Sequence, residues 1–334
     1  MVSRTNVTLR DDLLAIDEPV FASLDGAQFP DLPDALFAVD LRAVALFRER
    51  TDPTQRDYNR TAPRLLSLDG QTDWDGSVLA REDTLGRLLE LIGDNPAAVF
   101  WACPAGPDVL FDHLRRINRV LYPAGDVPPR PSNGGAPSDE TASSEPAADA
   151  GYEWVTFRHA DARAFVQVAS NLSDANRSKL LGPASEVLAP MDGSPAGNLE
   201  RFIAQGVPTS SVGPLRLSPD EVRRIEATRL AEVENVLDAY LERTLPREVR
   251  AQISDEDRRD YVRFALEDCQ ELGVATRAGR ARWSYMVAMT NGRISRDRRI
   301  RDLVRFGGRD PDDQVAQVLR SSARWLREEA RKAR

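Results

Sequence analysis

Short apolar runs of strand length punctuate the first part of the chain. Each run ends near Pro, Gly or Asp, residues that favour turns. The runs span residues 19–24, 43–47, 64–68 and 97–103, and the second equally fits a helix extending from Ala35. We therefore expect buried strands that follow one another with turns or helices between them.

Two amphipathic helices are expected among these strands. The first has four apolar residues at the spacing of one helical face: Leu85, Leu88, Leu89 and Ile92. Asp83 or Thr84 fits its N-cap. A second apolar stripe predicts a helix over residues 107–121. Strands that alternate with helices indicate a layered α/β domain with a mixed sheet.

A stretch rich in Pro, Gly, Ser and acidic residues, 123–150, contains almost no apolar side chains and predicts a disordered insertion. The alternating pattern of residues 152–157 then predicts a strand. A helix is expected to begin at Ser173 and to end at Gly182-Pro183. The insertion therefore lies within one domain, which we place at residues 1–217.

Helical signals dominate the rest of the chain. Ser218, Pro219 and Glu221 combine three signals of a helix start. A second helix is expected to begin at Ser254 and end at Gly273, and further apolar stripes predict three more helices before residue 334. We therefore expect an all-α domain at residues 218–334 and an α+β fold for the whole chain.

Charge divides the chain along the same boundary. Of the 334 residues, 1–217 carry 20 basic and 31 acidic side chains, whereas 218–334 carry 25 basic and 22 acidic ones. Only two of the basic residues are lysines. Without a long apolar segment or a signal-peptide pattern, the chain is expected to be cytoplasmic and not membrane-inserted.

Motifs for catalysis, cofactors and metals are largely missing from the sequence. It has no nucleotide-binding glycine motif and no serine-hydrolase or zinc-protease motif. Its two histidines, His113 and His159, fit structural roles better than a catalytic base. Cys103 and Cys269 are expected to be small buried residues. Residues 71–82 match part of a calcium loop but have Gln where its first Asp belongs. We therefore expect neither histidine-based catalysis nor a metal site.

A dense basic segment lies near the end of the chain. Residues 277–309 contain ten arginines and only two aspartates. This pattern fits a docking face for an acidic protein, a solvated helix face or a nucleic-acid interface. The candidate docking residues are Arg293, Arg296, Arg298, Arg299, Arg301 and Arg305.

Three landmarks occur in a fixed order along the sequence. The first follows the opening strand and consists of Leu24, Asp25, Gly26 and Ala27. The second begins at the end of a later strand and comprises Phe157, Arg158, Asp161 and Arg163, followed by Gly182 and Pro183. A helix over residues 111–116 precedes the second landmark. The third landmark, residues 217–221, opens the helical tail.

Taken together, these landmarks resemble the type VI secretion effector chaperone or adaptor family (Tap/TEC-like), cytoplasmic bacterial proteins that hand a toxin to the secretion spike. The resemblance implies a non-enzymatic adaptor whose partners are one toxin effector and a VgrG-type spike protein. It implies no nucleic acid and no cofactor.

The landmark residues also have structural interpretations. Asp25 and Gly26 fit a turn, Arg158 and Asp161 fit an ion pair at a strand-to-helix junction, and Gly182-Pro183 fits a helix stop. Each of these residues is expected either to support the fold or to contact a partner.

Two other functions remain open from the sequence. One is a hydrolase or transferase with a pocket around Asp25, Asp161 or His159, which requires strongly shifted carboxylate pKa values. The other is a nucleic-acid-binding module that uses residues 293–309.

Overall fold

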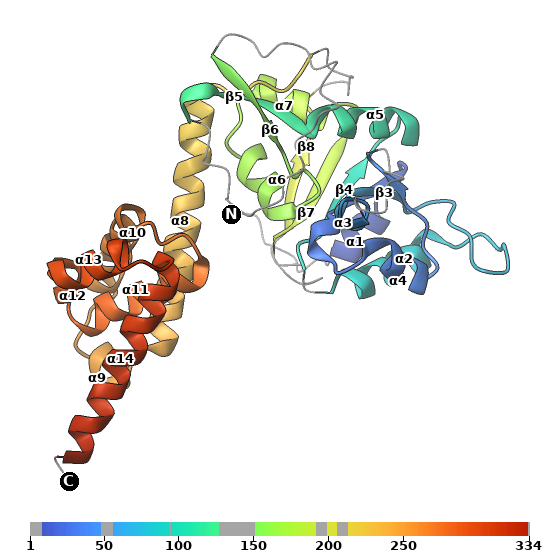
Figure 1. The fold of residues 1–334 in the computed structure, drawn as a ribbon. Coiled ribbons are helices and arrows are strands. Elements are labelled where there is room, and N and C mark those ends of the chain that lie inside the picture. The colour runs from blue at the N-terminus through green and yellow to red at the C-terminus, as the bar shows by residue number, and fades with distance from the viewer. Residues whose placement is uncertain are drawn as a thin grey trace. The chain divides into compact units, whose positions relative to one another are not determined.

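The computed structural model describes residues 9–47, 56–93, 95–126, 151–191, 199–205 and 213–332. It divides into two compact units, Met1–Glu226 and Ala227–Arg334 (Figure 1). The first unit contains the β-sheet and the second is helical, which confirms the expected α+β class. The division lies inside a long helix, a little beyond the boundary that the composition indicates.

The first unit is built on a six-stranded sheet with the strand order β2-β3-β1-β4-β7-β8. Its strands are β1 (Val20–Leu24), β2 (Val44–Ala45), β3 (Arg64–Ser67), β4 (Ala98–Ala102), β7 (Glu186–Pro190) and β8 (Leu199–Ile203). All its pairings are antiparallel. Two further strands, β5 (Arg119–Pro123) and β6 (Tyr152–Thr156), form a separate antiparallel ribbon.

Helices cover both faces of the six-stranded sheet, which explains its continuous apolar runs. Val99 and Trp101 of β4 point to one face, and Phe100 between them points to the other. Because both faces are buried, the strand needs an apolar residue at every position. The four strands that the apolar runs predict are therefore confirmed, including β2, which is a strand rather than a helix extension.

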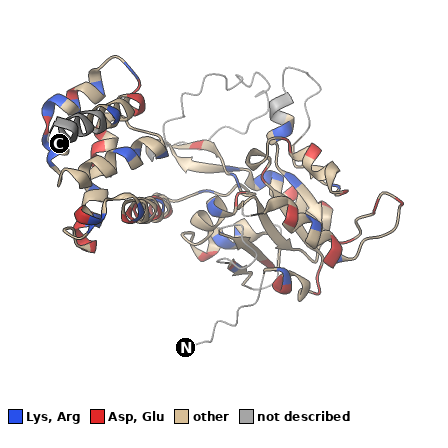
Figure 2. Ribbon diagram, turned by 90° about the horizontal axis from the view of Figure 1, so that it is seen from below, with Lys and Arg blue, Asp and Glu red and all other residues tan. Residues whose placement is uncertain are grey.

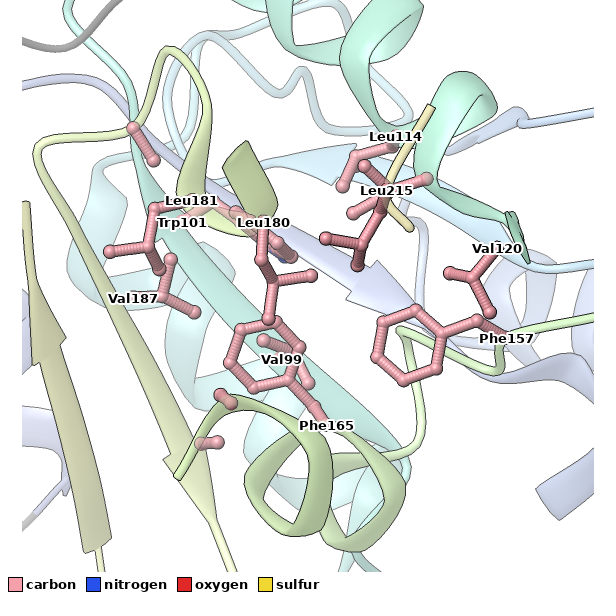
Figure 3. Close-up of a cluster of buried hydrophobic side chains, with 14 of the residues drawn as sticks. Val99, Trp101, Leu114, Val120, Phe157, Phe165, Leu180, Leu181, Val187 and Leu215 are labelled. Carbon is pink, nitrogen blue, oxygen red and sulfur yellow. The ribbon is translucent and has the colours of Figure 1, made fainter. Parts of the chain in front are cut away.

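Three helices pack on each face of the sheet. The face that bears Phe100 is covered by α1 (Leu9–Leu14), α2 (Leu32–Ala38) and α4 (Arg81–Ile92). The other is covered by α5 (Pro107–Ile117), α6 (Ala162–Ala169) and α7 (Asp174–Leu181). On this second side the rings of Trp101 and Phe165 meet edge to face, with centroids 5.3 Å apart (Figure 3). A further short helix, α3 (Arg56–Thr61), precedes β3.

Two expectations for this unit are wrong. The helix expected over residues 107–121 ends at Ile117, because the β-branched and aromatic residues that follow form β5. Helix α4 begins at Arg81 with Ala80 as N-cap, so neither Asp83 nor Thr84 caps it. Strands β7 and β8 were not expected. The 3₁₀ turn Ala124–Asp126 opens the Pro-rich stretch, and residues 127–150 lie outside the described residues.

The second unit consists of helices. They are most of α8 (Pro219–Thr244), then α9 (Arg247–Arg250), α10 (Asp255–Leu272), α11 (Arg277–Met289), α12 (Arg293–Arg296), α13 (Arg298–Phe306) and α14 (Pro311–Lys332). The expected start of α10 after Ser254 and its end at Gly273 are confirmed, and the structure shows a capping box at Ser254 and a left-handed conformation at Gly273. Trp283 is fully buried in the core and donates a hydrogen bond to Asp268 (3.1 Å). Among the described residues, no helix is long and apolar enough to cross a membrane.

Candidate functional site

The first landmark forms a tight turn at the end of β1. Asp25 is only 5% exposed, and its carboxylate accepts a hydrogen bond from the Ala27 amide (3.2 Å), capping the 3₁₀ turn Gly26–Gln28. A Cβ atom on Gly26 would lie 2.6 Å from the Ala62 carbonyl oxygen. Glycine is therefore required here by close packing against the backbone that follows α3.

The second landmark brings a cation to this turn. The Arg158 guanidinium forms an ion pair with Asp25, 133 residues away in sequence, and lies 3.6 Å from the Asp161 carboxylate. The side-chain amide of Gln28 donates a hydrogen bond to the Asp161 carboxylate (3.3 Å). We call Asp25, Gln28, Arg158 and Asp161 the motif cluster. The expected Arg158–Asp161 pair is confirmed, whereas the sequence gives no signal for the participation of Asp25 and Gln28.

Asp161 also holds the first turn of α6. Its carboxylate accepts hydrogen bonds from the amides of Arg163 (3.0 Å) and Ala164 (3.2 Å). An N-cap of this kind stabilises a helix by about 1 kcal/mol. The same side chain thus caps a helix and balances the charge of Arg158, which couples α6 to the turn after β1.

Asp25 is the more deeply buried of the two carboxylates in the motif cluster. Burial raises the pKa of Asp25, although the Arg158 charge and the hydrogen bonds from Arg158 and Ala27 oppose this effect. The Arg158 side chain is 48% exposed, so it is the solvent-accessible partner of the buried Asp25. Two carboxylates thus share one guanidinium, and of these three charged side chains only that of Arg158 is substantially exposed.

Both histidines are buried. His113 on α5 is 2% exposed, and its Nε2 lies 2.9 Å from the Leu180 carbonyl oxygen. Burial lowers the pKa of His113 to about 4 and, with a contribution from His113, that of His159 to about 3. Neither ring nitrogen of His159 has a hydrogen-bond partner in the described structure. The carboxylates of the motif cluster therefore have no imidazole bonded to them.

The remaining residues of the second landmark serve packing. Gly182 ends α7 with φ +57°, and a Cβ atom there would overlap the His113 ring. Pro183 is buried, and Phe157 belongs to the core on one face of the sheet. Leu24 of the first landmark belongs to the core on the other face. Arg163 is exposed and donates to the Met191 carbonyl (3.2 Å).

The third landmark anchors the start of α8 within the first unit. The Glu221 carboxylate accepts hydrogen bonds from the Ser218 amide, from the amide and hydroxyl of Ser173 and from the Asn176 side chain, at 2.7–2.8 Å. Burial opposes ionisation, but these donors outweigh it and lower the pKa of Glu221 to about 2. Ser173 itself caps α7, so one carboxylate joins the first turns of two helices.

The partial calcium motif does not form a metal site. Asp73 pairs with Arg87 (3.1 Å), and Glu82 pairs with Arg10 (2.6 Å). Within the described ranges, no group of three or more His, Cys, Asp or Glu side chains is placed to hold a metal ion. The segment instead forms a tight turn closed by a bridge between Thr72 and Val78.

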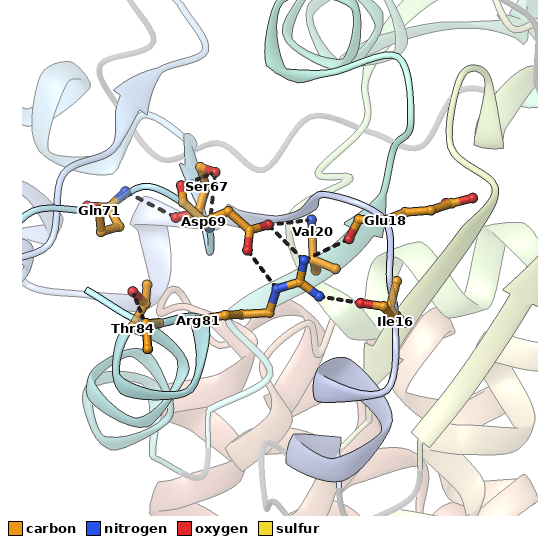
Figure 4. Close-up of polar contacts among 9 residues, drawn as sticks. Ile16, Glu18, Val20, Ser67, Asp69, Gln71, Arg81 and Thr84 are labelled. Carbon is orange, nitrogen blue, oxygen red and sulfur yellow. Dashed lines mark hydrogen bonds and ion pairs between the residues drawn. The ribbon is translucent and has the colours of Figure 1, made fainter. Parts of the chain in front are cut away.

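A polar junction that the sequence does not reveal joins α4 to the start of β1 (Figure 4). Arg81 pairs with Asp69 (2.7 Å) and donates to the carbonyl oxygens of Glu18 (2.9 Å) and Ile16. Asp69 in turn accepts from the Val20 amide (3.3 Å). This network fixes the first residue of α4 against the segment that leads into β1.

The candidate basic face separates into one structural arginine and five exposed ones. Arg301 forms ion pairs with Asp268 and with Glu271 (2.5 Å), which fastens α13 to α10. The exposed ones are Arg293, Arg296, Arg298, Arg299 and Arg305. Figure 2 marks the basic residues in blue and the acidic ones in red. Arg301 is thus better described as part of the fold than as part of a docking face.

The two cysteines are buried, as the sequence predicts. Burial raises the pKa of both thiols, that of Cys269 to about 12. Cys103 donates to the Pro183 carbonyl (3.6 Å). Because the thiolate is the reactive form, burial and the raised pKa both slow the reactions of these thiols at neutral pH.

Comparisons with protein-family models, with curated proteins and with solved structures give no match to this chain.

Proposed function

We propose that this protein is a type VI secretion effector adaptor that binds one toxin and promotes its loading onto the secretion spike. The observation that carries the proposal is the motif cluster. Residues from two landmarks, 133 positions apart, meet there as an ion pair at a strand-to-helix junction. The proposal also draws on the resemblance of the three ordered landmarks to the adaptor family.

The chemistry of the motif cluster favours binding over catalysis. Asp25 and Asp161 share a guanidinium, and His159 is bonded to neither of them. Catalysis by a carboxylate pair requires groups that can exchange protons with a substrate. A salt-bridged cluster instead fixes the shape of a surface, and a surface of fixed shape is what an adaptor presents to its partners.

The test is to purify the tagged full-length protein from its native cytoplasm at moderate salt, with a parallel sample treated with nuclease. We expect one large toxin, with or without the spike protein, to co-purify in both samples. If nucleic acid co-purifies instead and its yield falls steeply with salt, the adaptor function is overturned in favour of nucleic-acid binding. Recovery of no partner while the toxin is expressed would overturn the proposal.

A further inference from the structure

The apolar surface of helix α13 is wider than its contact with the core of the second unit. Val304 is fully buried and Ile300 is half-buried against the core of the second unit. On another side, Leu303 is 45% and Phe306 is 70% exposed. Arg299, Leu303 and Phe306 are spaced i, i+4, i+7 and therefore form one stripe along the helix.

Cationic side chains surround this exposed stripe. Arg299 and Arg305 are exposed, and no ion pair of the described residues involves either of them. The Arg305 guanidinium lies 5.2 Å from the centroid of the Phe306 ring. Arg298 lies 3.7 Å from Asp302, with both side chains largely exposed, so this pair neutralises little of the positive charge. We call Arg299, Leu303, Arg305 and Phe306 the α13 face.

We infer that the α13 face is a docking surface for an acidic segment of the carried protein, with apolar side chains set between its carboxylates. Exposed arginines form charge-assisted hydrogen bonds with carboxylates, and the Leu303–Phe306 stripe can bury apolar side chains of a partner. This inference rests on the proposed function, since the occupant is a segment of the cargo toxin.

An acidic protein fits this surface better than nucleic acid does. Asp297 and Asp302 are exposed on the same short segment and oppose any anionic partner, so charge alone does not distinguish the two kinds of partner. Arginine and aromatic residues beside an apolar centre are the composition of protein–protein interfaces. Leu303 would contribute little to nucleic-acid binding, but it extends the apolar stripe that a protein partner can bury.

The test places a photo-crosslinking residue, p-benzoylphenylalanine, at Phe306 of the full-length protein in its native cytoplasm. The same residue at the exposed Leu230 of α8 is the positional control. Two charge-reversal pairs are compared in the crosslinking chain, Arg299→Glu with Arg305→Glu, and Arg247→Glu with Arg259→Glu. The second pair makes the same charge change at exposed positions on α9 and α10.

We expect an adduct from position 306 whose crosslinked peptide is acidic and contains apolar residues. Its yield should fall about tenfold with the first charge-reversal pair and stay within about twofold with the second, because complementary charges set encounter rate and specificity. Adducts to a neutral or basic peptide, or equal effects of the two pairs, would overturn the inference.

Two further outcomes separate this inference from the proposed function. If the unmodified protein captures a toxin but position 306 gives no adduct, the adaptor proposal stands and the α13 face is not the docking surface. If position 306 crosslinks to nucleic acid, and the protein binds a short DNA duplex in a salt-dependent way, both the inference and the adaptor function are overturned.

Discussion

Both the backbone conformation at position 182 and a neighbouring side chain require glycine there. The residue has φ +57°, and a Cβ atom would also overlap the His113 ring. Gly93 ends α4 with nearly the same φ, +51°, but has open space around it. Substitution of Gly93 therefore tests backbone strain alone, whereas substitution of Gly182 tests backbone strain together with steric overlap.

We predict that Gly182→Ala destabilises the protein more than Gly93→Ala does. The control should lose about 1–3 kcal/mol of unfolding free energy from backbone strain alone. The overlap with His113 should add about 1–3 kcal/mol at position 182. Urea denaturation of both variants measures the difference, and equal losses would contradict the packing of His113 against α7.

Within the motif cluster, Asp161 acts both as a helix cap and as a charge. We predict that Asp161→Ala lowers the free energy of unfolding by about 1–2 kcal/mol, through loss of the α6 cap and of the interaction with Arg158. Asp161→Asn should recover most of the cap because an Asn side chain also accepts from the helix amides. Denaturant titration of both variants checks the order; an Asn variant as unstable as the Ala variant would show that the charge dominates.

Arg158 compensates for the burial of Asp25, so its removal should have a pH-dependent effect. Without the guanidinium, the already raised pKa of Asp25 rises further. In this variant the folded state is favoured while Asp25 is protonated. This contribution to the free energy of unfolding is lost as the pH rises through the folded-state pKa of Asp25. We predict that Arg158→Gln costs about 1–2 kcal/mol near pH 7 and less near pH 4, the half-exposed arginine keeping the loss modest. Arg163→Gln is the matched control and should show no such pH dependence.

At the level of elements, Glu221 connects the first turns of α7 and α8. We predict that Glu221→Gln lowers the free energy of unfolding by about 2 kcal/mol near pH 7, because the pKa shift from 4.5 to about 2 reflects stabilisation of the charged form. In the wild-type protein this contribution is present above pH 4.5 and disappears as the pH falls towards 2. Denaturant titration across this pH range measures it, and Asp220→Asn, an exposed neighbour in the same turn, is the control.

Elements with local signals could be predicted from the sequence, and those without them could not. Ser254 and Gly273 bound α10, and Ser173 and Gly182 bound α7, because caps act within one turn of the chain. Strand β7 has no comparable local signal. It exists because β4 offers it an edge, with Val187 facing Trp101 across the pair.

The same distinction applies to the candidate site. The Arg158–Asp161 pair could be predicted because the two residues are three positions apart. The Asp25–Arg158 pair depends on how the sheet and the β5–β6 ribbon are arranged, so no local pattern reveals it. The exposure of Leu303 and Phe306 likewise depends on which side of α13 meets the core.

At the scale of the whole molecule, both histidines of the chain belong to the first unit. Burial holds the pKa of His113 at about 4 and that of His159 at about 3, well below the ordinary 6.5. The folded state keeps the two rings neutral while the unfolded state protonates them. Their contribution is therefore present above pH 6.5 and is lost as the pH falls below it, by about 1.4 kcal/mol per pH unit for each histidine.

We predict that lowering the pH from about 7 to about 5 destabilises the first unit selectively. Trp101 and Trp283 are fully buried in the first and second units. Variants that keep only one of these two among the five tryptophans of the chain therefore report on one unit each. His159→Leu should remove about half of this pH dependence without leaving a hydrogen-bond partner unsatisfied. Equal acid sensitivity of the two units would show that the histidines do not control it.

The burial of both cysteines has a practical consequence for spectroscopy. Cys103 and Cys269 lie one in each unit, and their raised pKa values suppress reaction with thiol reagents near neutral pH. A cysteine introduced at an exposed position such as Trp74 or Phe264 would be labelled selectively without removal of either native thiol. A pair of fluorophores at these two positions would then report the distance between the units, and its distribution, before and after a partner binds.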